Sequence, residues 1–313
     1  MKYGFGIDLG GTTVKLAFFN EQGDLLSKWE IPTRPENGGE KILPDIAASV
    51  ADYLSKNNIP REDILGIGIG VPGPVRADGT VNKCVNLGWG VFNIEKALSD
   101  LTGFPVRAAN DANVAALGEC WMGGGKGYHS LVMATLGTGV GGGIIIDGKI
   151  LCGERGAAGE IGHLVLNRDE TERCGCGKKG CAEQYCSATG IVRTARQMLS
   201  ADPRPSTLRS IGNLTCKDIF DAANAGDGLA DEILDKVYAR LAEFLADLAA
   251  CFDPQVIVLG GGVSKAGQTL IDGIHRHWHK FVFHAMGDIQ FVLATLGNDA
   301  GAYGAFKLIL DNQ

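Results

Sequence analysis

The sequence predicts an α/β fold with a mixed or parallel sheet. Three observations support this prediction. Apolar strand-like segments alternate with helical patterns, glycine-rich turns follow three of these strands, and the opening strand–turn–strand pattern starts again near the middle of the chain. Alternating strands and helices are typical of α/β proteins, in which helices cover the faces of a sheet. With 313 residues, the chain is long enough for two domains.

The first half of the chain alternates between strand and helix patterns. Its predicted strands are either continuously apolar or alternate apolar and polar residues, and turn residues border them. Its first predicted helix has amphipathic spacing. The predicted elements are strands at residues 3–9, 14–20, 25–31, 65–70 and 106–109, and helices at residues 39–57 and 112–122.

The second half repeats the strand–glycine–strand unit of residues 7–18, which indicates a duplicated lobe. The predicted elements are strands at residues 131–136, 143–146 and 256–259, and helices at residues 229–251 and 298–310. A further helix follows the strand at 256–259. No low-complexity linker separates the halves, so we expect a rigid crossing between them rather than a flexible tether.

Composition excludes several classes of protein. An apolar share of 45% with 21% charged residues is ordinary for a globular chain and rules out intrinsic disorder. The 29 basic and 36 acidic residues give a net charge of −7. A net acidic chain without a basic cluster predicts neither nucleic acid nor an anionic membrane surface as a partner.

The chain has no pattern that predicts export or membrane insertion. Asp8 comes too early for the apolar core of a signal peptide. Residues 127–146 are uncharged, but six glycines and several polar residues make them a strand–turn–strand unit rather than a spanning helix. We therefore predict a cytoplasmic protein. Nine cysteines, an odd number, argue against a disulfide framework in such a chain.

Three glycine-rich turns predict a nucleotide site, because glycine lets backbone N–H groups surround phosphate oxygens. The Walker pattern is absent, and the glycines of the second turn lead into a strand, which disfavours a Rossmann dinucleotide site. The turn residues predicted to bind the nucleotide are Gly10, Gly11, Thr12, Thr13, Gly137, Thr138, Gly139, Gly141, Gly260, Gly261 and Gly262. Asp8 is placed to hold Mg²⁺ through water, or else only caps its turn, and Lys15 could reach phosphate.

Asn110 and Asp111 stand where a predicted strand meets a predicted helix. Asn and Asp are favoured N-cap residues, which is the preferred interpretation of this tetrapeptide taken alone. The same position suits a carboxylate base at a binding site, with an amide beside it for substrate hydroxyls. Ligands bind at strand ends in α/β sheets, so the cap and the catalytic interpretation are compatible with each other.

One histidine and three cysteines predict a metal site. His163, Cys174, Cys176 and Cys181 form a closed Cys₃His set, which is typical of structural zinc. The metal would fasten Glu160 near the cluster, together with Glu183. The other cysteines are predicted to be small core residues: Cys84, Cys120, Cys152, Cys186, Cys216 and Cys251.

Together these motifs resemble the ROK family of sugar kinases and repressors. The resemblance is carried by residues 8–13, 110–113, 136–143, the Gly-Glu-Ile-Gly-His box at 159–163, the cysteine loop at 174–183, and 259–263. Residues 86–89 and 183–185 resemble the glucokinase branch of the family, found in Gram-positive bacteria.

The resemblance implies a two-lobed actin-like ATPase (ribonuclease H-like) fold with a structural zinc loop at residues 163–181. Sugar and ATP would bind in the cleft between the lobes. The smaller lobe would comprise residues 1–112 and 297–313, and the larger lobe residues 113–296. Leu136 stands where an acidic residue often occurs in the wider superfamily. This difference weakens the prediction of a second metal-binding aspartate.

The resemblance also implies the roles of individual residues. Asp111 matches the catalytic base that takes the proton of the sugar 6-hydroxyl. The implied sugar-binding residues are Gly73, Asn86, Asn110, Asp111, Glu160, His163 and Glu183. The implied cofactors are ATP, Mg²⁺ and structural Zn²⁺, and the family pattern suggests a homodimer.

The leading hypothesis is an ATP-dependent hexokinase, most readily a glucokinase. Kinases for N-acetylglucosamine, N-acetylmannosamine, fructose and allose share these motifs, and polyphosphate remains open as a phosphoryl donor. A sugar-responsive repressor and a non-catalytic sugar-binding protein are the other hypotheses. The repressor hypothesis is poor, because the first motif strand begins at Tyr3 and leaves no room for a preceding DNA-binding domain. The presence of Asp8 and Asp111 counts against a non-catalytic protein.

Overall fold

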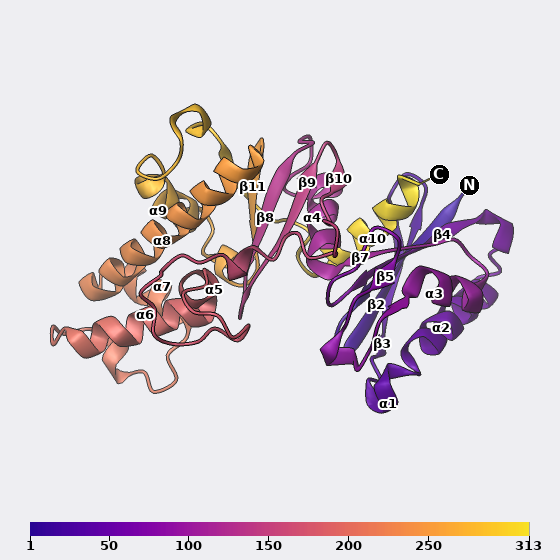
Figure 1. Cartoon of the computed structure of the whole chain (residues 1–313), viewed down its shortest axis with the longest axis horizontal. Coiled ribbons are helices and arrows are strands. Elements are labelled where there is room, and N and C mark those ends of the chain that lie inside the picture. The colour runs from indigo at the N-terminus through magenta and orange to yellow at the C-terminus, as the bar shows by residue number, and fades with distance from the viewer. Residues whose placement is uncertain (313) are drawn as a thin grey trace. The chain divides into compact units, whose positions relative to one another are not determined.

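The computed structural model describes residues 1–312 and contains two five-stranded sheets with helices around them (Figure 1). The strand orders are β3-β2-β1-β4-β7 and β10-β9-β8-β11-β12. Each sheet therefore begins with a meander of consecutive strands and continues through two crossovers. The shared order confirms the predicted repeat and the predicted α/β class.

The chain divides into two compact units, residues 1–129 with 143–159 and 295–313, and residues 130–142 with 160–294. The predicted lobes, which divide the chain near residues 112 and 297, stay a prediction. Each helix described within residues 1–312 is either too short or too polar to span a lipid bilayer.

The first sheet pairs β1 antiparallel with β2, and parallel with β4, which in turn pairs parallel with β7. Its strands are β1 Tyr3–Leu9, β2 Thr13–Asn20, β3 Leu25–Pro32, β4 Ile64–Val71 and β7 Val106–Asn110, with a separate small sheet of β5 Thr80–Val81 and β6 Phe92–Asn93. The helices of this unit are α1 Glu36–Gly39, α2 Ile42–Lys56, α3 Ile94–Thr102, α4 Asp111–Met122 and α10 Ala300–Leu310.

Helices cover both faces of the first sheet. Ile42 and Ile46 of α2 share a buried cluster with Phe5 and Ile7 of β1. On the opposite face, Phe306 of α10 stacks on Phe19. The alternation of side chains along β1 and β2 thus supplies two apolar faces, one for each helix layer.

Helices α4 and α10 pack unusually closely because Gly304 lies at their contact. A Cβ atom built on Gly304 would stand 1.7 Å from the carbonyl oxygen of Val114. Glu119 of α4 adds a polar connection: its buried carboxylate accepts hydrogen bonds from the N–H groups of Thr295 (2.9 Å) and Leu296 (2.8 Å). These contacts fix the segment that leads into α10.

We expect Gly304→Ala to lower the free energy of unfolding by about 1–3 kcal/mol, the usual cost of overpacking. The added methyl group collides with backbone that cannot move without separating the two helices. Urea unfolding measures the change. Gly228→Ala is the matched control, because no atom lies within 4 Å of a Cβ there. Equal stability of the two variants would contradict the proposed close packing.

The second sheet is formed by strands from the second half of the chain. Its strands are β8 Leu131–Leu136, β9 Val140–Ile146, β10 Lys149–Ile150, β11 Val256–Gly260 and β12 Gln290–Leu293. The helices of the second unit are α5 Glu183–Cys186, α6 Ala188–Ala201, α7 Cys216–Asn224, α8 Gly228–Phe252 and α9 Gln268–Trp278. Helix α9 packs on β12 through Trp278, whose ring meets Phe291 edge-on at 4.9 Å.

The predicted strands and long helices are confirmed, with shifted ends. Strand β9 begins at Val140 rather than 143, because the glycines that were expected to form a turn continue the strand. The closing helix begins at Ala300 after a 3₁₀ turn. Helices α3, α6 and α7 and strand β12 were not anticipated. The expectation that Cys251 is a core residue is wrong, because this side chain lies exposed on α8.

Candidate active site and metal cluster

In the first unit, the candidate residues stand at the carboxyl ends of neighbouring strands. Asp8 of β1 is in register with Gly70 of β4, and Val71 is in register with Asn110 of β7. Parallel strands end at one edge of a sheet, and this edge is where α/β proteins bind ligands. Residues distant in sequence thus meet along one edge of the sheet.

Asn110 and Asp111 form the junction between β7 and α4. The Asn110 side chain caps the helix by accepting hydrogen bonds from the N–H groups of Ala112 (3.0 Å) and Asn113 (3.2 Å). Its Nδ2 donates to the carbonyl of Gly73 (3.1 Å) and to Oδ1 of Asp111 (3.0 Å). The N-cap interpretation is confirmed, and the same amide orients the Asp111 carboxylate.

Gly73 follows β4 and has a φ of +122°, a conformation that favours glycine. Its carbonyl meets Asn110, so the structure brings together three of the predicted sugar-binding residues, Gly73, Asn110 and Asp111. Asn86 lies exposed in a 3₁₀ turn at Val85–Leu87. Within the described residues, no hydrogen bond joins the Asn86 side chain to Gly73 or Asn110.

Asp8 is largely buried beside the first glycine turn. Its Oδ2 lies 3.5 Å from the ammonium of Lys15, which is its cross-strand partner on β2. The turn closes through a hydrogen bond from the N–H of Gly10 to the carbonyl of Thr13 (3.0 Å). A Cβ atom on Gly301 would stand 2.9 Å from the Asp8 carboxyl carbon, so the glycine leaves room above this carboxylate.

Burial raises the pKa of Asp8 above its ordinary value, and Lys15 lowers it only in part. Because the pKa of the folded state exceeds that of the unfolded state, the ionised carboxylate destabilises the fold at neutral pH. This penalty disappears as the pH falls below the unfolded-state pKa, which is about 4 for aspartate. Asp8 therefore lowers the free energy of unfolding at neutral pH.

We expect Asp8→Asn to raise the thermal midpoint of the protein at pH 7, in the absence of nucleotide and added metal. The gain should shrink as the pH approaches about 4, where the native carboxyl group is also neutral. Differential scanning calorimetry at several pH values measures it, with Asp100→Asn, a change at an exposed position of helix α3, as the control. A variant that is less stable than the native protein at pH 7 would contradict this account of Asp8.

In the second unit, two of the predicted nucleotide turns lie side by side. Strands β8 and β11 are parallel, with Thr135 in register with Gly260. Gly261, with a φ of +82°, lies so close to Leu136 that a Cβ atom would stand 2.6 Å from the Leu136 backbone. Only glycine fits there, so the turn after β11 can rest directly on the turn after β8.

A cavity of about 530 Å³ adjoins the turn after β8. Thr138 of the turn lines it together with Thr189, Arg196 and Leu214. This volume falls in the range of small-molecule sites, and the mixture of an apolar wall with hydroxyl and guanidinium groups suits an aromatic base with a polar rim.

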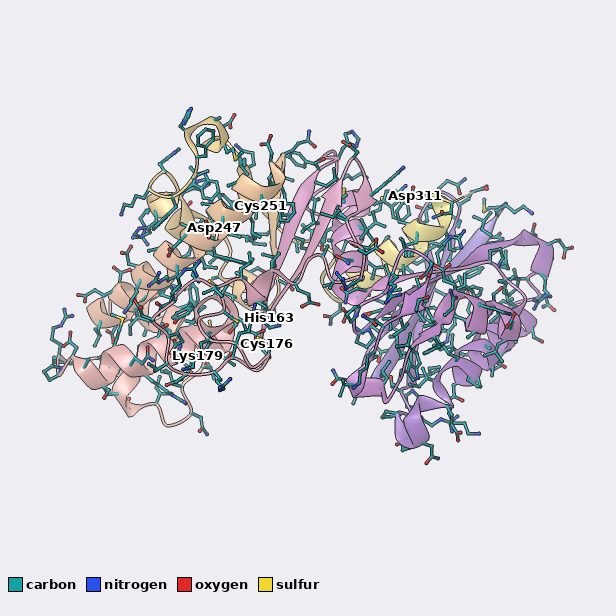
Figure 2. All side chains as sticks on the ribbon, in the orientation of Figure 1. His163, Cys176, Lys179, Asp247, Cys251 and Asp311 are labelled. Atoms are coloured by element: carbon teal, nitrogen blue, oxygen red, sulfur yellow. The ribbon has the colours of Figure 1, made fainter. Side chains whose placement is uncertain are left out.

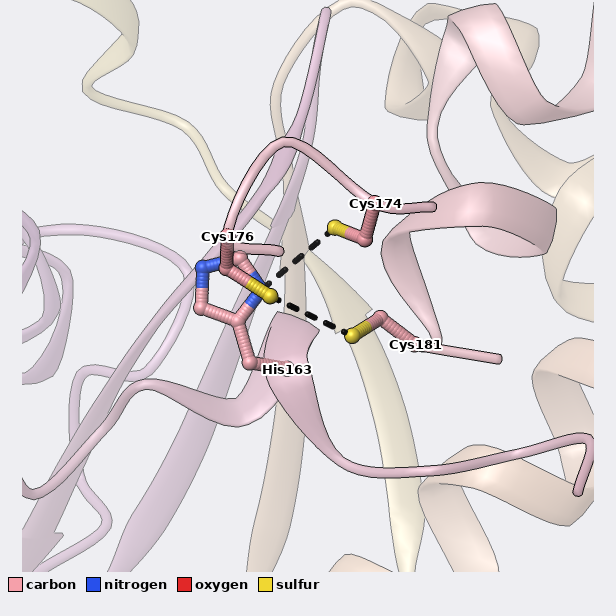
Figure 3. Close-up of side chains that lie close together, drawn as sticks. All are labelled: His163, Cys174, Cys176 and Cys181. Atoms are coloured by element: carbon pink, nitrogen blue, oxygen red, sulfur yellow. Dashed lines mark hydrogen bonds between the residues drawn. The ribbon is translucent and has the colours of Figure 1, made fainter. Parts of the chain in front are cut away.

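The metal cluster also belongs to the second unit. One ligand atom from each of the four predicted residues, His163 and the three cysteines, lies within 4.8 Å of the others. The Sγ atoms of Cys176 and Cys181 are 3.6 Å apart, and Cys174 Sγ lies 3.9 Å from Nδ1 of His163 (Figure 3). Ligand atoms around tetrahedral zinc lie roughly 3.3–3.8 Å apart, so the Cys176–Cys181 separation falls in this range, the Cys174–His163 separation lies just above it, and the donor set is one that zinc prefers.

The cluster is partly buried, with Cys176 on the outside and Cys181 inside. Burial raises the pKa of the Cys181 thiol to about 12. A metal binds the thiolate and displaces this proton, so metal affinity falls as the pH falls. Figure 2 shows His163 and Cys176 near each other on this loop, away from the exposed Cys251.

The two glutamates beside the cluster differ in their surroundings. Glu160 is exposed, and its carbonyl accepts a hydrogen bond from the N–H of His163 (3.2 Å). Glu183 is half-buried: its Oε1 lies 3.4 Å from Cys174 Sγ, and its Oε2 accepts a hydrogen bond from the N–H of Val140 (3.0 Å). Glu183 therefore contacts both the cluster and the end of the glycine turn.

The sequence did not point to Thr189, which holds the same turn from the start of α6, or to Ser187, which caps that helix. The Oγ1 atom of Thr189 donates a hydrogen bond to the carbonyl of Thr138 (2.8 Å). Neither residue belongs to a recognisable motif. The only available signal was the position of Ser187 as an N-cap, and that is a common structural role.

The fold and the site define a class of α/β proteins with two similar sheets, glycine turns at strand ends and a Cys₃His cluster beside one turn. The chain belongs to the ROK family, which matches residues 4–312. It is 43% identical to a glucokinase from Halalkalibacterium halodurans, over 98% of this chain and 95% of that protein.

Two further relatives bear on substrate and nucleotide. The crystal structure of a ROK family glucokinase from Streptomyces griseus in complex with glucose and AMPPNP is 35% identical, with a TM-score of 0.74 over 98% of both chains. An N-acetyl-D-glucosamine kinase from Aliivibrio salmonicida is 33% identical over 96% of this chain and 97% of that protein. This protein is thus similar to kinases for two kinds of hexose.

Proposed function

We propose that this protein phosphorylates glucose at its 6-hydroxyl with ATP as the phosphoryl donor. The observation that carries the proposal is the 43% identity to a glucokinase along nearly the whole chain. The Asn110–Asp111 pair at the end of β7 supplies the carboxylate that the reaction needs. The likeness to a glucokinase structure that holds glucose and AMPPNP supports both substrates.

In this proposal Asp111 accepts the proton of the 6-hydroxyl as the oxygen attacks the γ-phosphoryl group. Phosphoryl transfer asks a protein mainly to position the acceptor and to stabilise phosphate charge. Asn110 orients Asp111, and the sugar hydroxyls bind to Gly73, Asn86, Glu160, His163 and Glu183. Because Nδ1 of His163 faces the cysteines, its Nε2 is the atom left for a sugar hydroxyl.

The nucleotide binds to the glycine turns, with its phosphates near backbone N–H groups and its base in the cavity beside Thr138. Mg²⁺, held by Asp8 through water, neutralises phosphate charge. Zinc, held by His163 and the three cysteines, orders the loop and supplies no chemistry of its own, since the set is closed. We also propose the actin-like two-lobed fold, a homodimer and a cytoplasmic location, which the family resemblance supports.

The second candidate is a kinase for an N-acetylated hexose. The 33% identity to an N-acetyl-D-glucosamine kinase favours it over a kinase for fructose or allose. The two candidates differ only in the group at the sugar C2 position, and the chemistry at the 6-hydroxyl is the same.

A coupled assay for ADP release with Mg²⁺ and ATP tests the proposal across glucose, N-acetylglucosamine, N-acetylmannosamine and fructose. We expect the highest kcat/KM for glucose. The control is 6-deoxyglucose, which lacks the acceptor hydroxyl and should not stimulate ADP release. Preference for N-acetylglucosamine would support the second candidate, and the absence of sugar-stimulated ADP release would contradict a kinase altogether.

A further inference from the structure

The segment that follows the last cysteine of the metal cluster also holds the glycine turn after β8. This connecting segment comprises residues 181–189 and includes α5 and the start of α6. At its beginning, Gln184 Oε1 accepts hydrogen bonds from the N–H groups of Cys181 (3.1 Å) and Gly180 (2.9 Å). The segment is therefore fastened to the cluster at one end.

At its other end, the connecting segment binds the backbone of the turn at residues 137–140. The N–H of Ala188 donates to the carbonyl of Gly137 (2.8 Å), and Thr189 Oγ1 donates to the carbonyl of Thr138 (2.8 Å). Between these ends, the fully buried Ser187 donates to the carbonyl of Glu183 (2.7 Å) and caps α6.

Glu183 adds a direct connection between the cluster and the turn. One carboxylate oxygen lies 3.4 Å from Cys174 Sγ, and the other accepts the N–H of Val140. A Cβ atom on Gly139 would stand 2.3 Å from Glu183 Oε2, so this glycine is what lets the carboxylate reach the turn. Gly162, next to His163, packs as closely on the carbonyl of Val140.

These contacts decide which backbone groups of the turn remain available. The carbonyls of Gly137 and Thr138 and the N–H of Val140 are occupied by the connecting segment. Within residues 1–312, the N–H groups of Thr138 and Gly139 have no hydrogen-bond acceptor. Free N–H groups in a glycine turn are what phosphate oxygens bind.

We propose that the connecting segment couples the metal cluster to the nucleotide turn, so that metal occupancy sets nucleotide affinity. The sequence pointed only to Glu160 and Glu183 as residues that the metal would hold near the cluster. Thr189 is a positioning residue in this proposal, because it acts through the carbonyl of Thr138. The inference rests on the proposed function, in which this turn binds the phosphates of ATP.

Calorimetric titration with AMPPNP, in the absence of sugar, tests the coupling on zinc-loaded protein and on protein stripped by a chelator. We expect the Kd to rise by about 5- to 150-fold on zinc removal and to recover on zinc addition. Because coupling is reciprocal, AMPPNP should raise zinc affinity by the same factor, measured by competition with a chelating dye. An unchanged Kd in stripped protein with unchanged circular dichroism would overturn the inference.

A matched pair of variants keeps the test decisive if stripped protein unfolds. Thr189→Val removes the hydroxyl that holds the turn, and Thr189→Ser retains it. On zinc-loaded protein we expect Thr189→Val to raise the Kd for AMPPNP and to reduce the effect of AMPPNP on zinc affinity, with Thr189→Ser close to the native protein. If Thr189 instead acted by touching the nucleotide directly, Thr189→Val would raise the Kd for AMPPNP but would leave the effect of AMPPNP on zinc affinity unchanged. Native coupling in Thr189→Val would overturn the inference.

The two proposals fail in different ways. Zinc-loaded native protein that does not bind AMPPNP would contradict the proposed function and the coupling together. Binding of AMPPNP with the same Kd in the presence and absence of zinc would contradict the coupling alone.

Discussion

Asp111→Asn is expected to reduce kcat by about 10²–10⁴-fold while it leaves glucose binding nearly intact, because general base catalysis is typically worth this factor. In the native protein, Oδ1 of Asp111 accepts hydrogen bonds from the N–H of Ala112 (2.8 Å) and from the Asn110 amide. An asparagine can keep these two bonds through its own oxygen. Its amino group then stands in place of the second carboxylate oxygen and cannot accept a proton.

Steady-state kinetics and glucose titration on the same preparation measure the two effects separately. Asp52→Asn is the matched control, because Asp52 forms an exposed ion pair with Lys56 on α2. A variant that retains more than half of the native kcat would remove Asp111 from the role of base. A large loss of glucose binding would instead assign Asp111 to substrate binding.

Cys176→Ser is expected to lower zinc content below one per chain and to reduce kcat/KM for glucose by about 10²-fold. Cys176 is exposed, so the substitution removes a metal ligand without leaving a cavity in the core. A glycine-rich loop without its metal loses the order that positions Glu160, His163 and Glu183, and a misplacement of about 1 Å can cost such a factor in rate.

Cys251→Ser is the control for this variant, since it removes another exposed cysteine that lies outside the cluster. Metal analysis and kinetics on both variants decide the matter. Zinc-free Cys176→Ser protein with native KM and kcat would show that the metal is remote from function. Native protein that contains no zinc after purification in its presence would remove the site altogether.

Much of the fold could be predicted because its signals are local. Strand β1 and helix α8 have clear apolar patterns over their whole length, and turn residues border the strands. The start of β9 could not be predicted, since residues 141–143 are glycines that favour turns in isolation. They continue a strand here because β9 lies within a sheet whose pairing stabilises an extended backbone.

The candidate site likewise has a part that short sequence patterns predict and a part that they do not. Asn110 and the cluster of His163 with three cysteines are recognisable from short spacings, and the structure confirms the cap and the approach of the four ligands. The roles of the remaining residues as sugar or nucleotide ligands stay predictions. Thr189 had no local signal, because its importance comes from a turn 51 residues earlier in the chain.

The amino-acid pattern alone establishes the α/β class, the strands that end in glycine turns and the composition of the metal cluster. Packing between distant elements establishes which of these parts meet: Gly261 on Leu136, Glu119 with the segment before α10, and Glu183 with Val140. Short periodic patterns report which face of an element is buried. They carry no information about which distant backbone lies against it, because that depends on how whole elements pack.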